Sequence, residues 1–193
     1  MRLTDNIYQQ LKQDVFQAKY KPNEFISERQ IAEKYGISKI TASEALHRLC
    51  TEGHLTSYPR SGYMITSLSP REIEQLKRLR VAVESLAVEI ICEEATPDEI
   101  RPLYDDIVES FKEEDNASVI SFKFHMDMAK LTKDRFIVSI LESLLGAASR
   151  VEQHIPFSKT KNWQIYHKEI VDALMKRNVV SAKEYLIKDI NQR

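Results

Sequence analysis

The 193-residue sequence has few of the residues that build tight turns and cross-links, with four glycines, six prolines and two cysteines. So little turn material argues against an all-β protein and favours a mostly helical chain. Cys50 and Cys92 form no CxxC pair, so a secreted disulfide framework is not expected. We therefore expect a cytoplasmic protein that keeps its thiols reduced.

Long apolar runs and an excess of one charge are also missing. No stretch approaches the roughly 18 apolar residues that a membrane helix needs, and the N-terminus lacks a signal-peptide core. The chain carries 28 basic and 29 acidic residues, so any basic surface has to be local. Residues 1–66 carry nine basic and seven acidic residues, whereas residues 67–193 carry 19 and 22. This asymmetry has the sign expected for a nucleic-acid-binding head on a slightly acidic body.

The first part of the chain carries start and stop signals for three helices. Thr4 can cap the first helix. Ser27 and Gln30 have the spacing of a capping box, and Gly36 can end the helix that follows. Ser38 then caps a third helix that extends to about residue 50. The short interval at Gly36 predicts a tight turn between the second and third helices.

A hairpin is expected after the third helix. Residues 55–58 and 63–66 have strand-like composition, and residues 59–62 form the turn between them. Three helices followed by a hairpin have the order of a winged helix-turn-helix, whose third helix enters the major groove of DNA. The alternative is a small helical scaffold that carries a hairpin without binding DNA.

Residues 25–65 resemble the DNA-binding head of the GntR superfamily of bacterial transcription regulators. The shared motifs keep the family's spacing without gaps: Ser27-Glu28-Arg29, Ile31-Ala32-Glu33, Gly36-Ile37-Ser38, Glu44-Ala45-Leu46, Arg48-Leu49, Glu52-Gly53 and Gly62. The resemblance implies that a set of side chains faces DNA, namely Arg29, Ser38, Lys39, Thr41 and Ser43. It also implies that Gly62 lies near the minor groove. Arg48 and Arg60 add positive charge that would displace counterions from DNA.

Two positions depart from the family pattern. Lys39 and Ser43 each replace an arginine that is usual in the family. An arginine can grip O6 and N7 of guanine with two hydrogen bonds, and a serine cannot. We therefore expect an operator sequence that differs from those of relatives with both arginines.

Residues 68–193 are expected to form an all-α antiparallel bundle. Proline-containing start signals stand at residues 69–72 and 96–99, and further helices are expected over residues 117–131, after Asp134, and over residues 163–177 and 181–190. Apolar stripes mark the faces that should pack inward. In the first of these helices the stripe consists of Ile73, Leu76, Leu79, Val83, Leu86, Ile90 and Ile91, and in the fourth of Phe136, Ile137, Ile140, Leu141, Leu144 and Leu145. The domains expected are residues 1–67 and 68–193.

This second region resembles the FCD ligand-binding domain found in the FadR-type branch of the GntR superfamily. The matches are Arg80 and Glu84, Phe124-His125, Asp134-Arg135-Phe136 and His167. The resemblance implies that Arg80 points into an effector cavity, where its planar guanidinium could bind a carboxylate. An intrahelical pair with Glu84 is the other interpretation.

The resemblance also implies a divalent metal. The family often uses an aspartate and three histidines, and this sequence has Ser121, His125, His167 and Asp189 at those places. Two imidazoles and one carboxylate can hold Zn²⁺, Ni²⁺, Mn²⁺ or Fe²⁺, with Ser121 at most bridged through water. The alternative is a pair of buried histidines that form hydrogen bonds with Ser121, Asp189 or water.

These observations together predict a bacterial regulator that binds a two-fold DNA operator as a homodimer. A small organic acid bound in the bundle would change its affinity for DNA. The alternatives are a metal-dependent hydrolase with a His/His/Asp centre, and a constitutive DNA-binding protein whose bundle only dimerises. We find no convincing general base or nucleophile to accompany these metal ligands, and an enzyme would leave the DNA-binding head unexplained, so we expect no enzyme.

Overall fold

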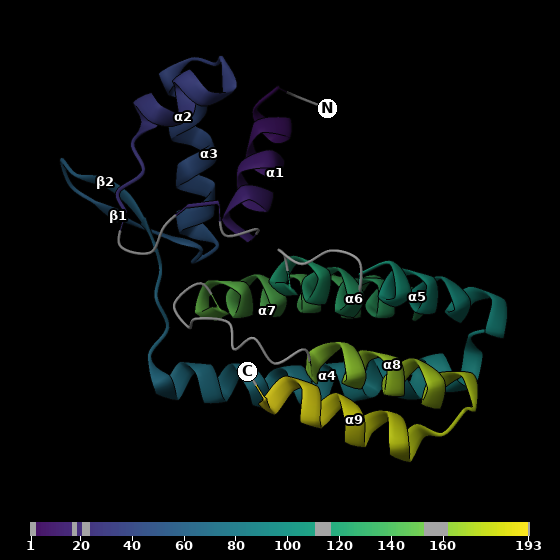
Figure 1. Ribbon diagram of the computed structural model, residues 1–193. Coiled ribbons are helices and arrows are strands. Elements are labelled where there is room, and N and C mark those ends of the chain that lie inside the picture. The colour runs from purple at the N-terminus through teal and green to yellow at the C-terminus, as the bar shows by residue number, and fades with distance from the viewer. Residues whose placement is uncertain (1–2, 17–18, 21–23, 111–116, 153–161, 193) are drawn as a thin grey trace. The chain divides into compact units, whose positions relative to one another are not determined.

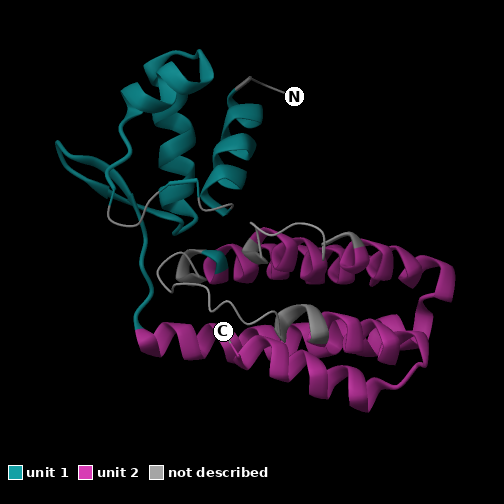
Figure 2. Cartoon of the chain, in the orientation of Figure 1, with its two compact units in different colours: residues 1–69, 149–156 teal, residues 70–148, 157–193 magenta. Residues whose placement is uncertain are grey.

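The computed structural model describes residues 3–16, 19–20, 24–110, 117–152 and 162–192. Contacts divide the chain into two units, residues 1–69 with 149–156 and residues 70–148 with 157–193 (Figure 2). The first is called the head below, and the second the helical unit. Their elements, in chain order, are α1 (Leu3–Phe16), α2 (Glu28–Tyr35), α3 (Lys39–Thr51), β1 (Leu55–Tyr58), β2 (Gly62–Ile65), α4 (Pro70–Glu94), α5 (Pro97–Ser110), α6 (Ala117–Leu131), α7 (Arg135–Glu152), α8 (Asn162–Met175) and α9 (Val179–Asn191) (Figure 1).

The head has the expected winged helix-turn-helix order. Helix α3 packs against both α1 and α2, and the antiparallel strands pair Leu55 with Ile65 and Tyr58 with Gly62. The two capping signals form as predicted, because Ser27 and Gln30 make a reciprocal capping box and the Ser38 hydroxyl accepts a hydrogen bond from the backbone of α3. Thr4 does not cap α1, since the helix already includes Leu3.

A fully buried apolar core holds the three helices of the head together. Its side chains come from all three helices: Leu11, Val15, Ile31, Ala42, Ala45, Leu46 and Leu49. Gly36 ends α2 with a φ of 65°, in the left-handed region that glycine adopts without strain. The turn between α2 and α3 is therefore as short as the sequence indicates.

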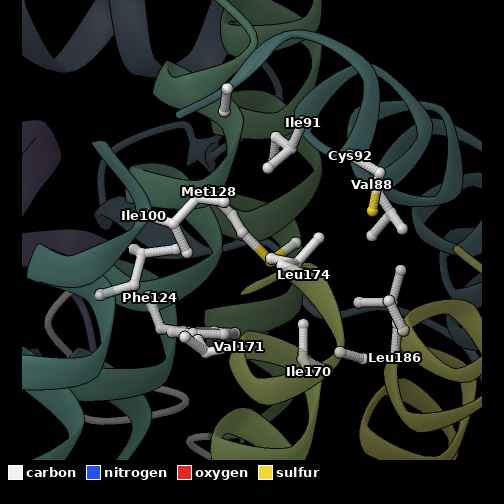
Figure 3. Packing of buried hydrophobic residues seen from close by; sticks show 14 of the residues in the cluster. Val88, Ile91, Cys92, Ile100, Phe124, Met128, Ile170, Val171, Leu174 and Leu186 are labelled. Carbon is white, nitrogen blue, oxygen red and sulfur yellow. The ribbon is translucent and has the colours of Figure 1, made fainter. Parts of the chain in front are cut away.

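The helical unit is a bundle of α4 to α9, which confirms the predicted fold class. Within it, α9 packs on α4 and α8, and α5 packs on α6 and α8. One core cluster draws on α4, α5, α6, α8 and α9 (Figure 3), and it includes Val88, Ile91, Ile100, Phe124, Met128, Ile170, Leu174 and Leu186. A second cluster joins α4, α6 and α7 through Ala87, Met126, Ala129, Ile137, Leu141 and Leu145.

The predicted apolar stripes of α4 and α7 are wider than the faces that pack inward. Leu79 and Leu86 of α4, and Phe136 and Ile140 of α7, are exposed. The expectation that these four residues join the core is therefore wrong for the single chain. Helical spacing places residues on a face, but only the neighbouring helices decide how much of that face they cover.

Candidate DNA-binding surface and buried histidine cluster

The N-terminus of α3 carries three of the predicted DNA-contacting residues. Ser38 caps the helix, and its hydroxyl lies 3.0 Å from the hydroxyl of Thr41. Lys39 is exposed at the first helical position. Free backbone N–H groups and the positive end of the helix dipole favour an anion at this place. Such a helix end is suited to hold a DNA phosphate.

The predicted basic residues differ in how far other groups already engage them. Arg29 is exposed at the start of α2, and its Nε lies 2.7 Å from Oε1 of Glu33. Arg48 contacts Asp5 of α1 at 2.9 Å, and its guanidinium lies over the ring of Tyr8. Arg48 therefore also links α3 to α1 within the head, a role that the sequence analysis did not foresee. The proposed contacts of both arginines with DNA stay predictions.

Ser43 has a partner that the sequence analysis missed. Its hydroxyl donates a hydrogen bond of 2.7 Å to Oε1 of Glu28, which also accepts one of 3.2 Å from Tyr63 in β2. Glu28 thus joins the first turn of α2, the middle of α3 and the wing. Glu28 stands in the motif Ser27-Glu28-Arg29, but no spacing rule relates it to Ser43, 15 residues away.

The wing owes its glycine to a close approach of two backbone segments. Gly62 has a φ of 112°, and a Cβ there would lie 2.7 Å from the carbonyl oxygen of Ile26. Ile26 forms an isolated bridge with Tyr63, so the segment before α2 pairs with the wing. Arg60 is exposed in the turn with a φ of 65°. Packing inside the head is therefore enough to require Gly62, whatever its place near DNA.

His54 directly precedes β1. The structure buries it against Phe16, with its Nε2 3.3 Å from Oε2 of Glu52. His54 is therefore a core residue of the head.

The helical unit brings together the three residues that the resemblance implies as metal ligands. His125 comes from α6, His167 from α8 and Asp189 from α9, and all three are fully buried. One ligand atom from each lies within 4.8 Å of the others. Nε2 of His125 is 3.1 Å from Oδ2 of Asp189, and Nε2 of His167 is 3.6 Å from Oδ1. Both imidazoles therefore direct the same nitrogen to one carboxylate.

This donor set fits a transition-metal ion. Two atoms that each lie about 2.0–2.1 Å from a tetrahedral zinc ion are about 3.4 Å apart. The nitrogen–oxygen separations of 3.1 and 3.6 Å are near this value, and they end on the two different oxygens of Asp189. The ring of His167 is held in its plane by stacking on Phe124, with the centroids 3.9 Å apart. Ser121 is buried one helical turn before His125 on α6. Its hydroxyl is a weaker ligand than an imidazole or a carboxylate.

A buried charged pair on α4 extends the cluster. Nε of Arg80 lies 2.7 Å from Oε1 of Glu84, and Oε2 of Glu84 lies 2.6 Å from Nδ1 of His125. The intrahelical pair is therefore present, yet it is linked to a predicted metal ligand. Within the described part of the chain, Nη2 of Arg80 has no hydrogen-bond partner. Sequence reasoning named both Arg80 and Glu84 but missed the contact between Glu84 and His125.

The electrostatics of the cluster follow from its burial. Burial by itself would raise the pKa of Glu84, but the positive charges of Arg80 and His125 outweigh it and lower the pKa to about 2. Burial opposes a charged His125, yet the carboxylates of Glu84 and Asp189 raise its pKa above 6.5. The charged forms of Glu84 and His125 therefore favour each other inside the cluster.

Two family models match the chain over most of its length. The model described as bacterial regulatory proteins of the gntR family matches residues 3–65, and the FCD domain model matches residues 75–192. The chain belongs to the GntR family of regulators with an FCD domain.

The HTH-type transcriptional regulator YdhC of Bacillus subtilis is 28% identical to this GntR regulator over 95% of the chain and 86% of its own length. The Nta operon transcriptional regulator of Aminobacter aminovorans is 29% identical over 75% of the chain and 68% of its own length. Such relatives and the family indicate a DNA-binding transcription regulator and not an enzyme, so the hydrolase alternative falls away.

Solved structures support the fold of this GntR regulator. Escherichia coli McbR/YncC matches 100% of the chain and 95% of its own with a TM-score of 0.89 and 18% identity. A GntR regulator from Rhodococcus matches 98% and 94% with a TM-score of 0.86 and 20% identity. Among the residues described, no helix is long and apolar enough to span a membrane.

Proposed function

We propose that this GntR regulator binds a two-fold DNA operator as a homodimer and that a small carboxylate in the helical unit changes its affinity for DNA. The observation that carries the proposal is the buried cluster of Arg80, Glu84, His125, His167 and Asp189. Burying this many ionisable groups costs free energy that a purely structural bundle would avoid with apolar residues. A ligand site gives the cluster a reason to be retained.

A divalent metal held by His125, His167 and Asp189 would make the site attractive to an anion. The charges of Arg80 and a divalent ion, set against those of Glu84 and Asp189, leave one positive charge in the cluster. A bound ion supplies a Lewis acid for a carboxylate oxygen. The N–H donor at Nη2 of Arg80 supplies a further hydrogen bond of the kind that carboxylates accept. These features together favour a small organic acid over a neutral effector.

The exposed apolar side chains of α4 and α7 support the homodimer. Leu79 is 55% exposed and Leu86 follows it seven residues later on α4, while Phe136 is 63% exposed on α7. A set of large apolar side chains on a regulator's surface is typical of an interface with a second copy. Two heads on one operator also make twice the base contacts of a single head. A reducing cytoplasm is the compartment in which such a regulator would meet DNA.

DNA binding comes first in the test. The purified full-length chain is mixed with a random-sequence duplex library, and enriched sequences are read. We expect a two-fold symmetric motif and an affinity that falls steeply with salt. Lys39→Ala should weaken binding to DNA. It should also reduce the slope of log affinity against log salt concentration by about the amount that one phosphate contact contributes. Binding of the symmetric motif by a single chain would contradict the homodimer. Full affinity of Lys39→Ala for DNA would contradict the proposed contact between α3 and DNA.

Effector binding is tested on the selected duplex. Small carboxylic acids are added with and without Zn²⁺, and the affinity for DNA is followed by fluorescence anisotropy. We expect Arg80→Lys, which keeps the charge but loses the planar fork, to lose the response to the acid. Arg78→Lys is the matched control, because Arg78 is exposed two residues away on α4. An affinity for DNA that no acid or metal changes would favour the constitutive, purely dimerising alternative.

A further inference from the structure

Ile40 is a large apolar residue in an unusual place. It is the second residue of α3, and its side chain is 73% exposed, the highest exposure among the exposed large hydrophobic residues in the described part of the chain. Single exposed apolar residues are common on proteins. The position of Ile40, rather than its exposure alone, therefore has to carry the argument.

Ile40 lies on the side of α3 that faces away from the core of the head. Ala42, Ala45, Leu46 and Leu49 form the buried face of the helix. A step of 100° per residue puts residue 40 opposite that face, in line with the exposed residues at positions 44 and 47. The second helix of a helix-turn-helix uses its N-terminal residues to contact base edges in the major groove. Ile40 therefore belongs to the surface of the helix that reads DNA.

The chemistry of an isoleucine side chain restricts what it can read there. It offers no hydrogen bond, and the C5-methyl group of thymine is the apolar feature that the major groove presents. We propose that Ile40 contacts a thymine methyl group and so makes this regulator prefer thymine at one position of its operator. Branching at Cβ leaves the side chain nearly one rotamer in a helix, so little conformational freedom is lost on contact.

Residue 43 makes such a contact more important in this chain. Ser43 stands where relatives carry an arginine, and its hydroxyl donates to Glu28 inside the head. The hydroxyl hydrogen of Ser43 is then not available to a DNA base. An apolar contact from Ile40 is a source of sequence preference that does not need the missing arginine.

The test removes the methyl group and changes nothing else. Two random duplex libraries are prepared, one with thymidine and one with deoxyuridine in its place, and each is selected with the full-length wild-type chain and with Ile40→Ala. We expect the wild type to prefer thymine at one position of each half-site. Its affinity for the selected duplex should fall about fourfold for each contacted thymine that is replaced by deoxyuridine, the effect of losing one buried methyl. Ile40→Ala should bind both duplexes equally.

Matched variants separate this effect from a general loss of binding. Val180→Ala shortens another highly exposed apolar residue, in α9, and should keep the full response to deoxyuridine. Ile40→Val keeps the branch and should keep most of the response. If Ile40→Ala does not fold, Ile40→Ser, which also leaves no methyl group beyond Cβ, gives the same comparison. Wild-type binding that ignores the methyl group, or the same sensitivity in the wild type and Ile40→Ala, would overturn the proposal while leaving DNA binding intact. A selection in which the wild type enriches no sequence would overturn the proposed DNA-binding function, on which this inference rests.

Discussion

Metal binding by the buried cluster should be visible as a shift in thermal stability. The chain is stripped with a chelator, and its thermal unfolding is followed with and without Zn²⁺ or Ni²⁺. At a free metal concentration 100 times the dissociation constant, a ligand that binds only the folded state stabilises it by about 2.7 kcal/mol. The helical unit spans about 120 residues, and unfolding entropy is roughly 2.1 cal/mol/K per residue, so the melting temperature should rise by roughly 10 °C.

The geometry decides which variants lose this response. His167→Ala removes one of the three donors, and the two that remain on α6 and α9 should hold the ion far more weakly. His47→Ala is the control, since His47 is exposed on α3 and lies in the other unit. Ser121→Asp should strengthen the response, because a carboxylate one turn before His125 shares its helix face.

The response should also depend on pH. Glu84 and Asp189 raise the pKa of His125, so a proton occupies its ring below that raised pKa and competes with the metal for Nε2. Binding should therefore be tighter at pH 8 than at pH 6. A melting temperature that ignores added metal at both pH values, or a His167→Ala variant that responds like the wild type, would refute the reasoning. The two histidines would then be hydrogen-bonded core residues.

Three further substitutions test other contacts. Gly62→Ala puts a Cβ 2.7 Å from the carbonyl oxygen of Ile26 at a φ of 112°, and it should lower the head's free energy of unfolding by about 1–3 kcal/mol in urea; an unchanged midpoint would contradict the close approach. Ser43→Arg places a guanidinium beside Glu28. In a selection from random duplexes, this variant should prefer guanine at one position by about 1–3 kcal/mol. An unaltered motif would show that residue 43 does not face the groove. Glu84→Gln should destabilise the helical unit by about 3–5 kcal/mol at pH 7. The pKa of Glu84 in the folded chain is about 2. The wild type should therefore exceed the variant in free energy of unfolding by the full amount above about pH 4.5, and this difference should disappear as the pH falls toward 2. A difference in free energy of unfolding that stays the same at every pH would argue against a charged Glu84.

The local architecture of the chain is determined by signals that act over a few residues. Ser27 and Gln30 cap α2 because their side chains and backbone groups lie three residues apart, and Gly36 ends that helix because glycine enters the left-handed region freely. Asp134 caps α7 in the same way, with a hydrogen bond of 2.7 Å from the backbone of Phe136. Such contacts are readable in the sequence since both partners are adjacent in the chain. The resemblance to the GntR family rests on the same local motifs, and the two family models confirm it.

Other contacts of the candidate site residues were decided only by the tertiary structure. The resemblance pairs His125 with Asp189, 64 residues away, but no spacing rule relates Glu84 on α4 to His125 on α6. The spacing of apolar residues along α4 likewise did not reveal that Leu79 is exposed. Periodicity assigns a residue to a helix face, but the neighbour that covers this face comes from a distant part of the chain. The charge state of His125 depends on those neighbours, because burial and the two carboxylates act on it only once the helices have packed.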